Sequence, residues 1–259
     1  MIITTLWWVV CLLGGCGTVS KTKETSHETK PDYSIGVVGA NAPYYEKKEE
    51  GKASGMYVEL MDALAKKEDF SYQFVEIDAS RVKQDLENHT IDGFLGTFEE
   101  EKGQEDKLSQ TASFYVSKLC VATPKKTGIR KFQNMKNKEI AACGGTMEES
   151  LAKYFAVKYK AREVTFSSME DVIADVDSGY SQLMVADQNY YEAHQDLLSD
   201  WNCLKMKTER KNSHRLTSLS DTQKEEGESF FTIFKTGIDQ LKKEGTLQKI
   251  TGTITKKQK

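Results

Sequence analysis

The order of the apolar segments limits the fold of this chain more than any other feature. Strand-like runs at 33–39, 72–77 and 91–95 alternate with helix-like stretches at 56–67 and 82–88. A β-α-β-α-β order of this kind predicts a parallel sheet with helices packed on it. Ligands of such sheets bind beyond the carboxyl ends of the strands, so polar residues at those ends are candidate site residues.

A second set of alternating elements follows an apolar strand at 114–123 and a polar boundary at 124–128. The predicted elements of this set are a strand at 139–143, a helix at 147–159, a strand at 164–166, a helix at 169–176, a strand at 183–186 and a helix at 190–198. The pattern predicts a second α/β unit with its own sheet.

The helix at 147–159 is the most clearly defined element of the second unit. We expect Leu151, Tyr154 and Phe155 to form its buried face, because they recur at helical spacing. Thr146 is a candidate N-cap, and Glu148 in the first turn suits the helix dipole.

The C-terminal part of the chain is predicted to return to the first unit. The segment 202–211 crosses back, a helix spans 230–241, and a short helix begins at 245. Two α/β units joined in this way predict two lobes, each a mainly parallel sheet flanked by helices, that close on a ligand by hinge motion. We expect lobe 1 to comprise 33–119 plus 209–259, and lobe 2 to comprise 120–208.

The N-terminus has the character of a targeting segment. An apolar run at 2–13 is too short to span a bilayer and ends in Gly14, Gly15 and Cys16, which resembles a bacterial lipobox. We therefore expect 1–15 to be a signal peptide, Cys16 to carry a lipid, and 16–32 to be a flexible tether. A buried core segment is the disfavoured alternative. Residues 1–15 contain no Lys or Arg, and we expect the natural start to lie upstream.

Composition narrows the function. The net charge of −3 comes from interspersed acidic and basic residues, which argues against a nucleic-acid partner. The four histidines are scattered and no nucleophile elbow or P-loop occurs, so we expect no metal, no cofactor and no catalytic residues. Of the cysteines after Cys16, we expect Cys120, Cys143 and Cys203 to be free buried thiols, with one disulfide as the alternative.

Six short motifs, in this order and at these spacings, resemble one known family. They are 55–60 (GMYVEL), 86–93 (LENHTIDG), 135–141 (MKNKEIA), 143–146 (CGGT), 178–187 (SGYSQLMVAD) and 237–247 (GIDQLKKEGTL). The family is bacterial extracellular solute-binding protein family 3, the amino-acid-binding receptors of ABC importers. The resemblance covers nearly the whole mature chain and implies a two-lobed periplasmic-binding-protein type II (Venus flytrap) fold.

The resemblance also implies a ligand site. In the family, an Arg after the third strand and a helix N-terminus hold the ligand carboxylate, and an Asp in lobe 2 takes the ammonium. Asp187 falls on the Asp position, whereas Gln104 or, with a slip, Lys102 stands in place of the Arg. The residues that we expect to bind the ligand are Asn41, Tyr44, Met56, Thr97, Phe98, Glu99, Gln104, Thr146 and Asp187.

The loop after strand 91–95 bears on the ligand. Glu99 and Asp187 facing one cleft would repel a carboxylate and favour an amine or guanidinium. The alternatives are that 99–101 (EEE) is a solvated loop, or that the site no longer binds amino-acid-like molecules.

The resemblance implies a monomeric, lipid-anchored receptor on the extracytoplasmic face of the cell membrane. It would capture a small polar solute, an amino acid or an amine, and deliver it to an ABC permease. A surface sensor or interaction lipoprotein on the same fold is the alternative, and a dehydratase-type enzyme ranks third.

Overall fold

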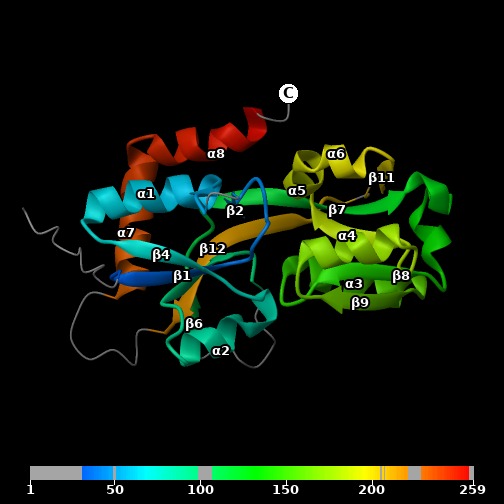
Figure 1. Cartoon of the computed structure of the whole chain (residues 1–259), viewed down its shortest axis with the longest axis horizontal. Coiled ribbons are helices and arrows are strands. Elements are labelled where there is room, and N and C mark those ends of the chain that lie inside the picture. The colour runs from blue at the N-terminus through cyan, green and yellow to red at the C-terminus, as the bar shows by residue number, and fades with distance from the viewer. Residues whose placement is uncertain are drawn as a thin grey trace, which may run out of the picture. The chain divides into compact units, whose positions relative to one another are not determined.

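The computed structural model describes residues 31–48, 51–98, 107–204, 206, 208–220 and 229–256 (Figure 1). Residues from Pro31 onward form one compact unit. Within this unit two α/β lobes are linked by a pair of long strands, so the expected fold class is confirmed. Among the described residues, no helix has the length and apolar character needed to cross a membrane.

Lobe 1 is built on three parallel strands, with β1 paired to both β4 and β5. Its elements are β1 (Tyr33–Val37), β2 (Glu46–Lys47), β3 (Ala53–Ser54), α1 (Met56–Glu68), β4 (Tyr72–Glu76), the 3₁₀ turn η1 (Ala79–Arg81), α2 (Val82–Glu87), β5 (Gly93–Gly96), β6 (Leu108–Gln110), α7 (Phe230–Lys243) and α8 (Thr246–Lys256). Helices α1, α7 and α8 pack together on one side of this sheet and α2 lies on the other (Figure 1). Neighbouring residues of β5 show why, because Leu95 packs with the first group and Phe94 with the α2 group.

Lobe 2 repeats this plan with β10 and β9 paired in parallel to β8. Its elements are η2 (Lys125–Thr127), η3 (Phe132–Met135), β8 (Glu139–Cys143), α3 (Met147–Tyr159), β9 (Arg162–Phe166), α4 (Met169–Asp177), β10 (Leu183–Asp187), α5 (Gln188–Ala193), α6 (Gln195–Leu198) and β11 (Trp201–Leu204). In β8, Ile140 packs toward α3 and Ala141 toward α4. A strand that is buried on both faces reads as a continuous apolar run, which is why β8 and β10 could be recognised in the sequence.

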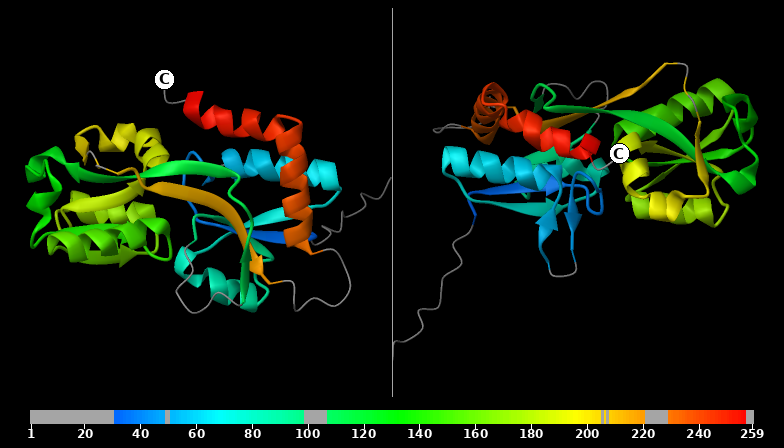
Figure 2. Two further views of the ribbon diagram at one scale, coloured as in Figure 1. Left: turned by 180° about the vertical axis from the view of Figure 1, so that it is seen from behind. Right: turned by 90° about the horizontal axis from the view of Figure 1, so that it is seen from above.

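Two long antiparallel strands, β7 (Tyr115–Pro124) and β12 (Lys211–Leu219), connect the lobes (Figure 2). Their first halves pair with each other, Tyr115 opposite His214 and Ser117 opposite Asn212. Beyond this ribbon β7 pairs with β10 and β11 in lobe 2, and β12 pairs with β5 and β6 in lobe 1. Each strand therefore belongs to both lobes. Within the described residues, these two strands are the only chain connections between the lobes, so a hinge motion of the lobes bends or twists this ribbon.

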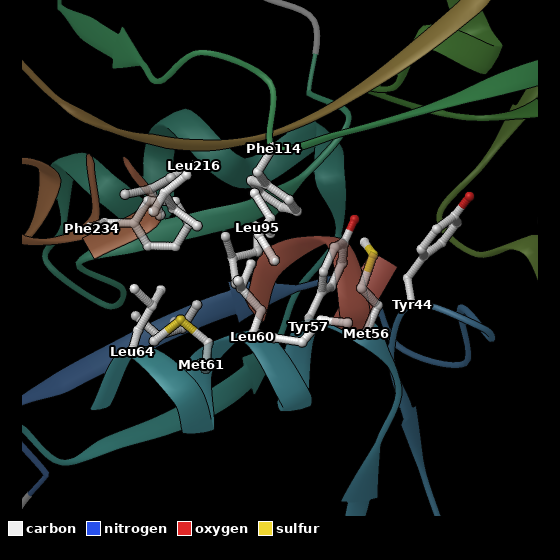
Figure 3. Close-up of a cluster of buried hydrophobic side chains, with 14 of the residues drawn as sticks. Tyr44, Met56, Tyr57, Leu60, Met61, Leu64, Leu95, Phe114, Leu216 and Phe234 are labelled. Carbon is white, nitrogen blue, oxygen red and sulfur yellow. The ribbon is translucent and has the colours of Figure 1, made fainter. Parts of the chain in front are cut away.

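Helix α1 forms the centre of the lobe 1 core. Its buried side chains recur at helical spacing and point toward Leu95, Phe114 and Leu216 (Figure 3). Gly55 precedes the helix with φ of 118°, and a Cβ there would lie 2.4 Å from the carbonyl oxygen of Tyr44. Only glycine allows the chain to pass so close, so this position fixes the Tyr44 loop against the start of α1.

The structure corrects several local predictions. Tyr154 is 41% exposed, because Ala152 rather than Tyr154 joins Leu151 and Phe155 on the buried face of α3. The predicted helix at 190–198 is interrupted at His194 and forms α5 and α6. The segment predicted to cross back, 202–211, contains β11 of lobe 2, and the return is made by β12. Cys120 and Cys143 are buried free thiols, whereas Cys203 is an exposed one.

Truncation of Phe234 tests the lobe 1 core. Phe234 is 1% exposed in α7 and packs against Phe114 and Phe230. Phe234→Ala should lower the free energy of unfolding by about 3 to 5 kcal/mol, measured by urea denaturation, because it leaves a cavity. Lys235→Ala, at the exposed neighbouring position, should change it by less than about 0.5 kcal/mol. Equal effects of the two substitutions would contradict this account of the core.

Candidate functional site

Polar side chains line one face of the ribbon where it passes between the lobes. Opposite residues of an antiparallel pair lie on the same face, so Tyr115, Ser117, Asn212 and His214 share a face. Ser117, Asn212 and His214 are buried, whereas Val116 on the other face is 47% exposed. Buried polar groups need partners, and these side chains find them in both lobes.

The carboxylate of Asp187 is the main hydrogen-bond acceptor for these side chains. Asp187 ends β10 and caps α5, with Oδ1 accepting from the backbone N–H of Asn189 at 2.9 Å. The hydroxyl of Tyr44 in lobe 1 donates to the same oxygen at 2.7 Å. Oδ2 accepts from the hydroxyl of Ser117 and from Nδ2 of Asn212, the latter at 2.8 Å. One carboxylate therefore joins lobe 1, lobe 2 and the ribbon.

His214 extends the network into lobe 1. Its Nε2 lies 3.0 Å from the Ser117 hydroxyl and its Nδ1 lies 2.7 Å from the Tyr57 hydroxyl. Burial lowers the pKa of His214 to about 4, so the ring is neutral at physiological pH. Because Ser117 donates to Asp187, it accepts from Nε2–H of His214, and Nδ1 then accepts from Tyr57. The hydrogen bonds thus run in one direction, from Tyr57 to Asp187.

Glu148 is the second buried carboxyl group of the cluster. It lies in the first turn of α3, is 7% exposed, and accepts from Nδ2 of Asn212 at 3.1 Å through Oε1. Burial, followed by the negative charge of Asp187, raises the pKa of Glu148 to about 7. Asn212 therefore bridges two acidic groups, Glu148 and Asp187, with one amide nitrogen.

The N-terminus of α3 is occupied by acceptors of the protein itself. The backbone N–H of Met147 lies 3.3 Å from the carbonyl oxygen of Thr97, and that of Gly145 donates to Glu149 at 2.7 Å. Thr146 makes no capping hydrogen bond, contrary to the expectation, because its hydroxyl donates to the carbonyl oxygen of Cys143 at 2.7 Å. These two N–H groups are therefore not available to an anion at this end of the helix.

Aromatic rings enclose the lobe 1 side of the cluster. Tyr44 stacks on Tyr57 with ring centroids 5.8 Å apart, and its ring lies 4.3 Å from that of His214 and 6.1 Å from that of Tyr115. Figure 3 shows Tyr44 and Tyr57 near the N-terminal end of α1. Burial and the neighbouring Asp187 carboxylate raise the pKa values of both phenols, so both keep their protons.

The lobes also touch around a groove of about 800 Å³ beside this cluster. Phe98 and Thr146 form a β-bridge across it. Gly145 has φ of 74°, and a Cβ added there would lie 2.5 Å from the backbone nitrogen of Ser80 in lobe 1. The close approach of the two lobes at this point therefore requires glycine.

The residues predicted to bind a ligand are only partly brought together. Tyr44 and Asp187 are hydrogen-bonded, and Thr97, Phe98 and Thr146 lie where the lobes meet. Met56 is 2% exposed in the lobe 1 core, and Asn41 forms a β-bridge with Tyr45 in a tight loop. Glu99 and Gln104 lie outside the described residues, as does Lys102.

Other members of the cluster were not predicted from the sequence as site residues. They are Tyr57, Tyr115, Ser117, Glu148, Asn189, Asn212 and His214. A signal existed for the ribbon, because in β12 Asn212 and His214 occupy alternate positions of a strand, the spacing of residues that share one face. Glu148 gave no such signal, since an acidic residue in a first helical turn is ordinary on an exposed helix.

Comparison with known proteins identifies the class. Residues 33–255 match the model of the bacterial extracellular solute-binding proteins, family 3, and the chain belongs to this family. Its relatives include the arginine-binding extracellular protein ArtP of Bacillus subtilis (strain 168), which is 21% identical over 198 residues, 73% of this chain and 78% of the relative.

Solved structures share the fold at low sequence identity. The substrate-binding protein of an amino acid ABC transporter superposes with a TM-score of 0.75 at 19% identity, covering 86% of this chain and 99% of that chain. An ancestral arginine-binding protein bound to arginine gives a TM-score of 0.73 at 18% identity, covering 85% of this chain and 96% of that chain. All three similar proteins are named for binding a substrate or arginine.

The pKa of Glu148 predicts an unusual pH dependence of stability. Because its pKa is raised in the folded protein, Glu148 contributes most to stability below pH 4.5, and this contribution is lost as the pH rises through 7. Relative to wild type, Glu148→Gln should therefore gain about 3 kcal/mol in free energy of unfolding between pH 4.5 and pH 8, measured by urea denaturation.

His214→Gln provides a control of opposite sign. The lowered pKa of His214 costs the wild type stability as the pH falls from 6.5 to about 4, so this variant should gain relative to wild type on acidification. A difference from wild type that stays constant with pH for both variants would contradict the burial of these two groups.

Proposed function

We propose that this protein is an extracytoplasmic substrate-binding lipoprotein of an ABC importer, and that it captures a small polar solute, an amino acid or an amine, between its lobes. Family membership supports the binding role, and the relatives named above bind or import amino acids. The proposed partner in the membrane is the permease of the importer.

One observation carries the proposal. The hydrogen bonds of Asp187 join lobe 1 and lobe 2 at the ribbon about which the lobes can hinge. Opening would withdraw the Tyr44 hydroxyl from Asp187 and expose polar groups that need new partners. A solute that enters the open cleft and bridges these groups from both lobes favours closure around it, which is how binding drives a hinge motion.

The proposed organisation of the chain follows from the same reading. A signal peptide at 1–15 is removed, the lipid on Cys16 anchors the protein, and 16–32 serves as the tether. Residues 33–119 plus 209–259 form lobe 1 and 120–208 form lobe 2, with the boundaries near the ends of the ribbon. Of the proposed site residues, Tyr44 and Asp187 would contact the solute, with Thr97, Phe98 and Thr146 at the rim.

A ligand screen tests the binding role. The purified protein should show a thermal shift of roughly 5 to 10 °C with at least one member of a panel of amino acids, amines and small peptides, at about 100 times its Kd. Asp187→Asn should abolish that shift, because the carboxylate is at the centre of the cluster. Absence of a shift across the whole panel would sink the proposal.

Substitution of two neighbouring glycines tests whether ligand binding requires the lobes to close. Gly145→Ala should weaken binding of the ligand found in the screen by about tenfold or more in calorimetry, because the new methyl group would meet the Ser80 backbone when the lobes touch. Gly144→Ala is the matched control, since a Cβ there has its nearest neighbour at 3.6 Å. Equal affinities of the two variants would show that binding does not need the contact at Gly145.

A further inference from the structure

Two hydrogen-bond acceptors of the buried cluster have no donor among the described residues. Oε2 of Glu148 and Oδ1 of Asn212 are buried, and neither has a hydrogen-bond partner among the described residues. The two side chains are in contact through Nδ2 of Asn212, and are 7% and 1% exposed. An unpaired buried acceptor costs free energy, so this pair of atoms is suited to a group that brings donors.

The charges of the cluster lead to the same conclusion. Within the described part of the chain, no Lys or Arg forms an ion pair with Glu148 or Asp187. His214 lies 3.9 Å from Asp187 but is neutral at physiological pH, because burial lowers its pKa to about 4. Two buried carboxylates without a cation are costly, and a bound cation would offset that cost.

The same region is unfavourable for an anionic group of a ligand. The N–H groups of Gly145 and Met147 at the start of α3 are already paired with Glu149 and Thr97. The carboxyl group of Glu148 lies in the same turn and would repel a ligand carboxylate. The start of α3 therefore disfavours a ligand carboxylate.

We propose that Glu148, Asn212 and Asp187 form a subsite for an organic ammonium or guanidinium group whose carbon carries no carboxylate. The solute class is therefore an amine rather than an amino acid. When the lobes close on the ligand, the ammonium takes the place of the Tyr44 hydroxyl on Asp187 and donates to the free oxygens of Glu148 and Asn212. This assignment rests on the proposed function and names its substrate class.

Pairs of compounds that differ only in a carboxylate test the assignment. Agmatine against L-arginine and cadaverine against L-lysine are suitable, with the affinity of the purified protein measured by calorimetry. The amine of at least one pair should bind at least tenfold more tightly than its amino acid. A preference for the amino acid in both pairs overturns this inference and leaves the proposed function intact. Binding of neither member of either pair, together with a negative panel, overturns both.

Substitution locates the subsite. Glu148→Gln should weaken amine binding at least tenfold and should reduce the preference for the amine over the amino acid. Glu244→Gln removes an exposed carboxylate at the end of α7, whose ion pair is with Lys67, and should leave both affinities unchanged. An unchanged preference in Glu148→Gln would overturn the role of Glu148.

The pH dependence of amine binding by the wild-type protein is a further test, and it needs no substituted protein that has to fold. The titratable groups around Glu148 are Asp187 from β10, Tyr57 from α1, His214 from β12 and Cys143 from β8. Burial raises the pKa of Cys143 to about 12 and raises that of Tyr57 well above its usual value, so both stay protonated. Alkylamines keep their charge in this range. Of these groups Glu148, whose pKa is raised to about 7, loses its negative charge between pH 8 and pH 5.5. Amine affinity should therefore fall at least tenfold over this range, and a constant affinity would overturn the inference.

Discussion

The arrangement of the lobes depends on the hydrogen bonds that the carboxylate of Asp187 accepts. This carboxylate accepts hydrogen bonds from Tyr44 in lobe 1, from Ser117 and Asn212 in the ribbon, and from the backbone of lobe 2. A charged acceptor with four donors is well satisfied although it is only 4% exposed. Since each donor comes from a different strand, loop or helix, relative movement of the lobes must break part of this set.

The buried carboxyl group of Glu148 adds a second, electrostatic constraint to the site. Burial raises its pKa to about 7, so near neutral pH the folded protein holds a group that is costly to ionise. Sites that bind ligands often contain such unfavourable features, because the ligand relieves them and the relief contributes to affinity. Glu148 is only 7% exposed, so the packing around it excludes water and maintains this cost.

Much of the fold was predictable from the sequence. Helix α3 (Met147–Tyr159) has the bounds that were expected, and α1, α4 and β10 each extend one residue further at the C-terminal end. These elements carry strong local patterns, either apolar runs or helical periodicity. The course of β12 was misplaced because a strand with buried polar residues lacks the apolar pattern of a core strand, and its pairing is decided by distant segments.

The sequence by itself determined the alternation of strands and helices, and hence two α/β lobes with Asp187 at the carboxyl end of a strand, because periodicity and chain order are local properties. Only the tertiary structure decided which polar side chains meet. Tyr44 and Asp187 are 143 residues apart, and Glu148 and Asn212 are 64 apart. Their hydrogen bonds and the raised pKa of Glu148 arise from burial between packed elements, which no local pattern encodes.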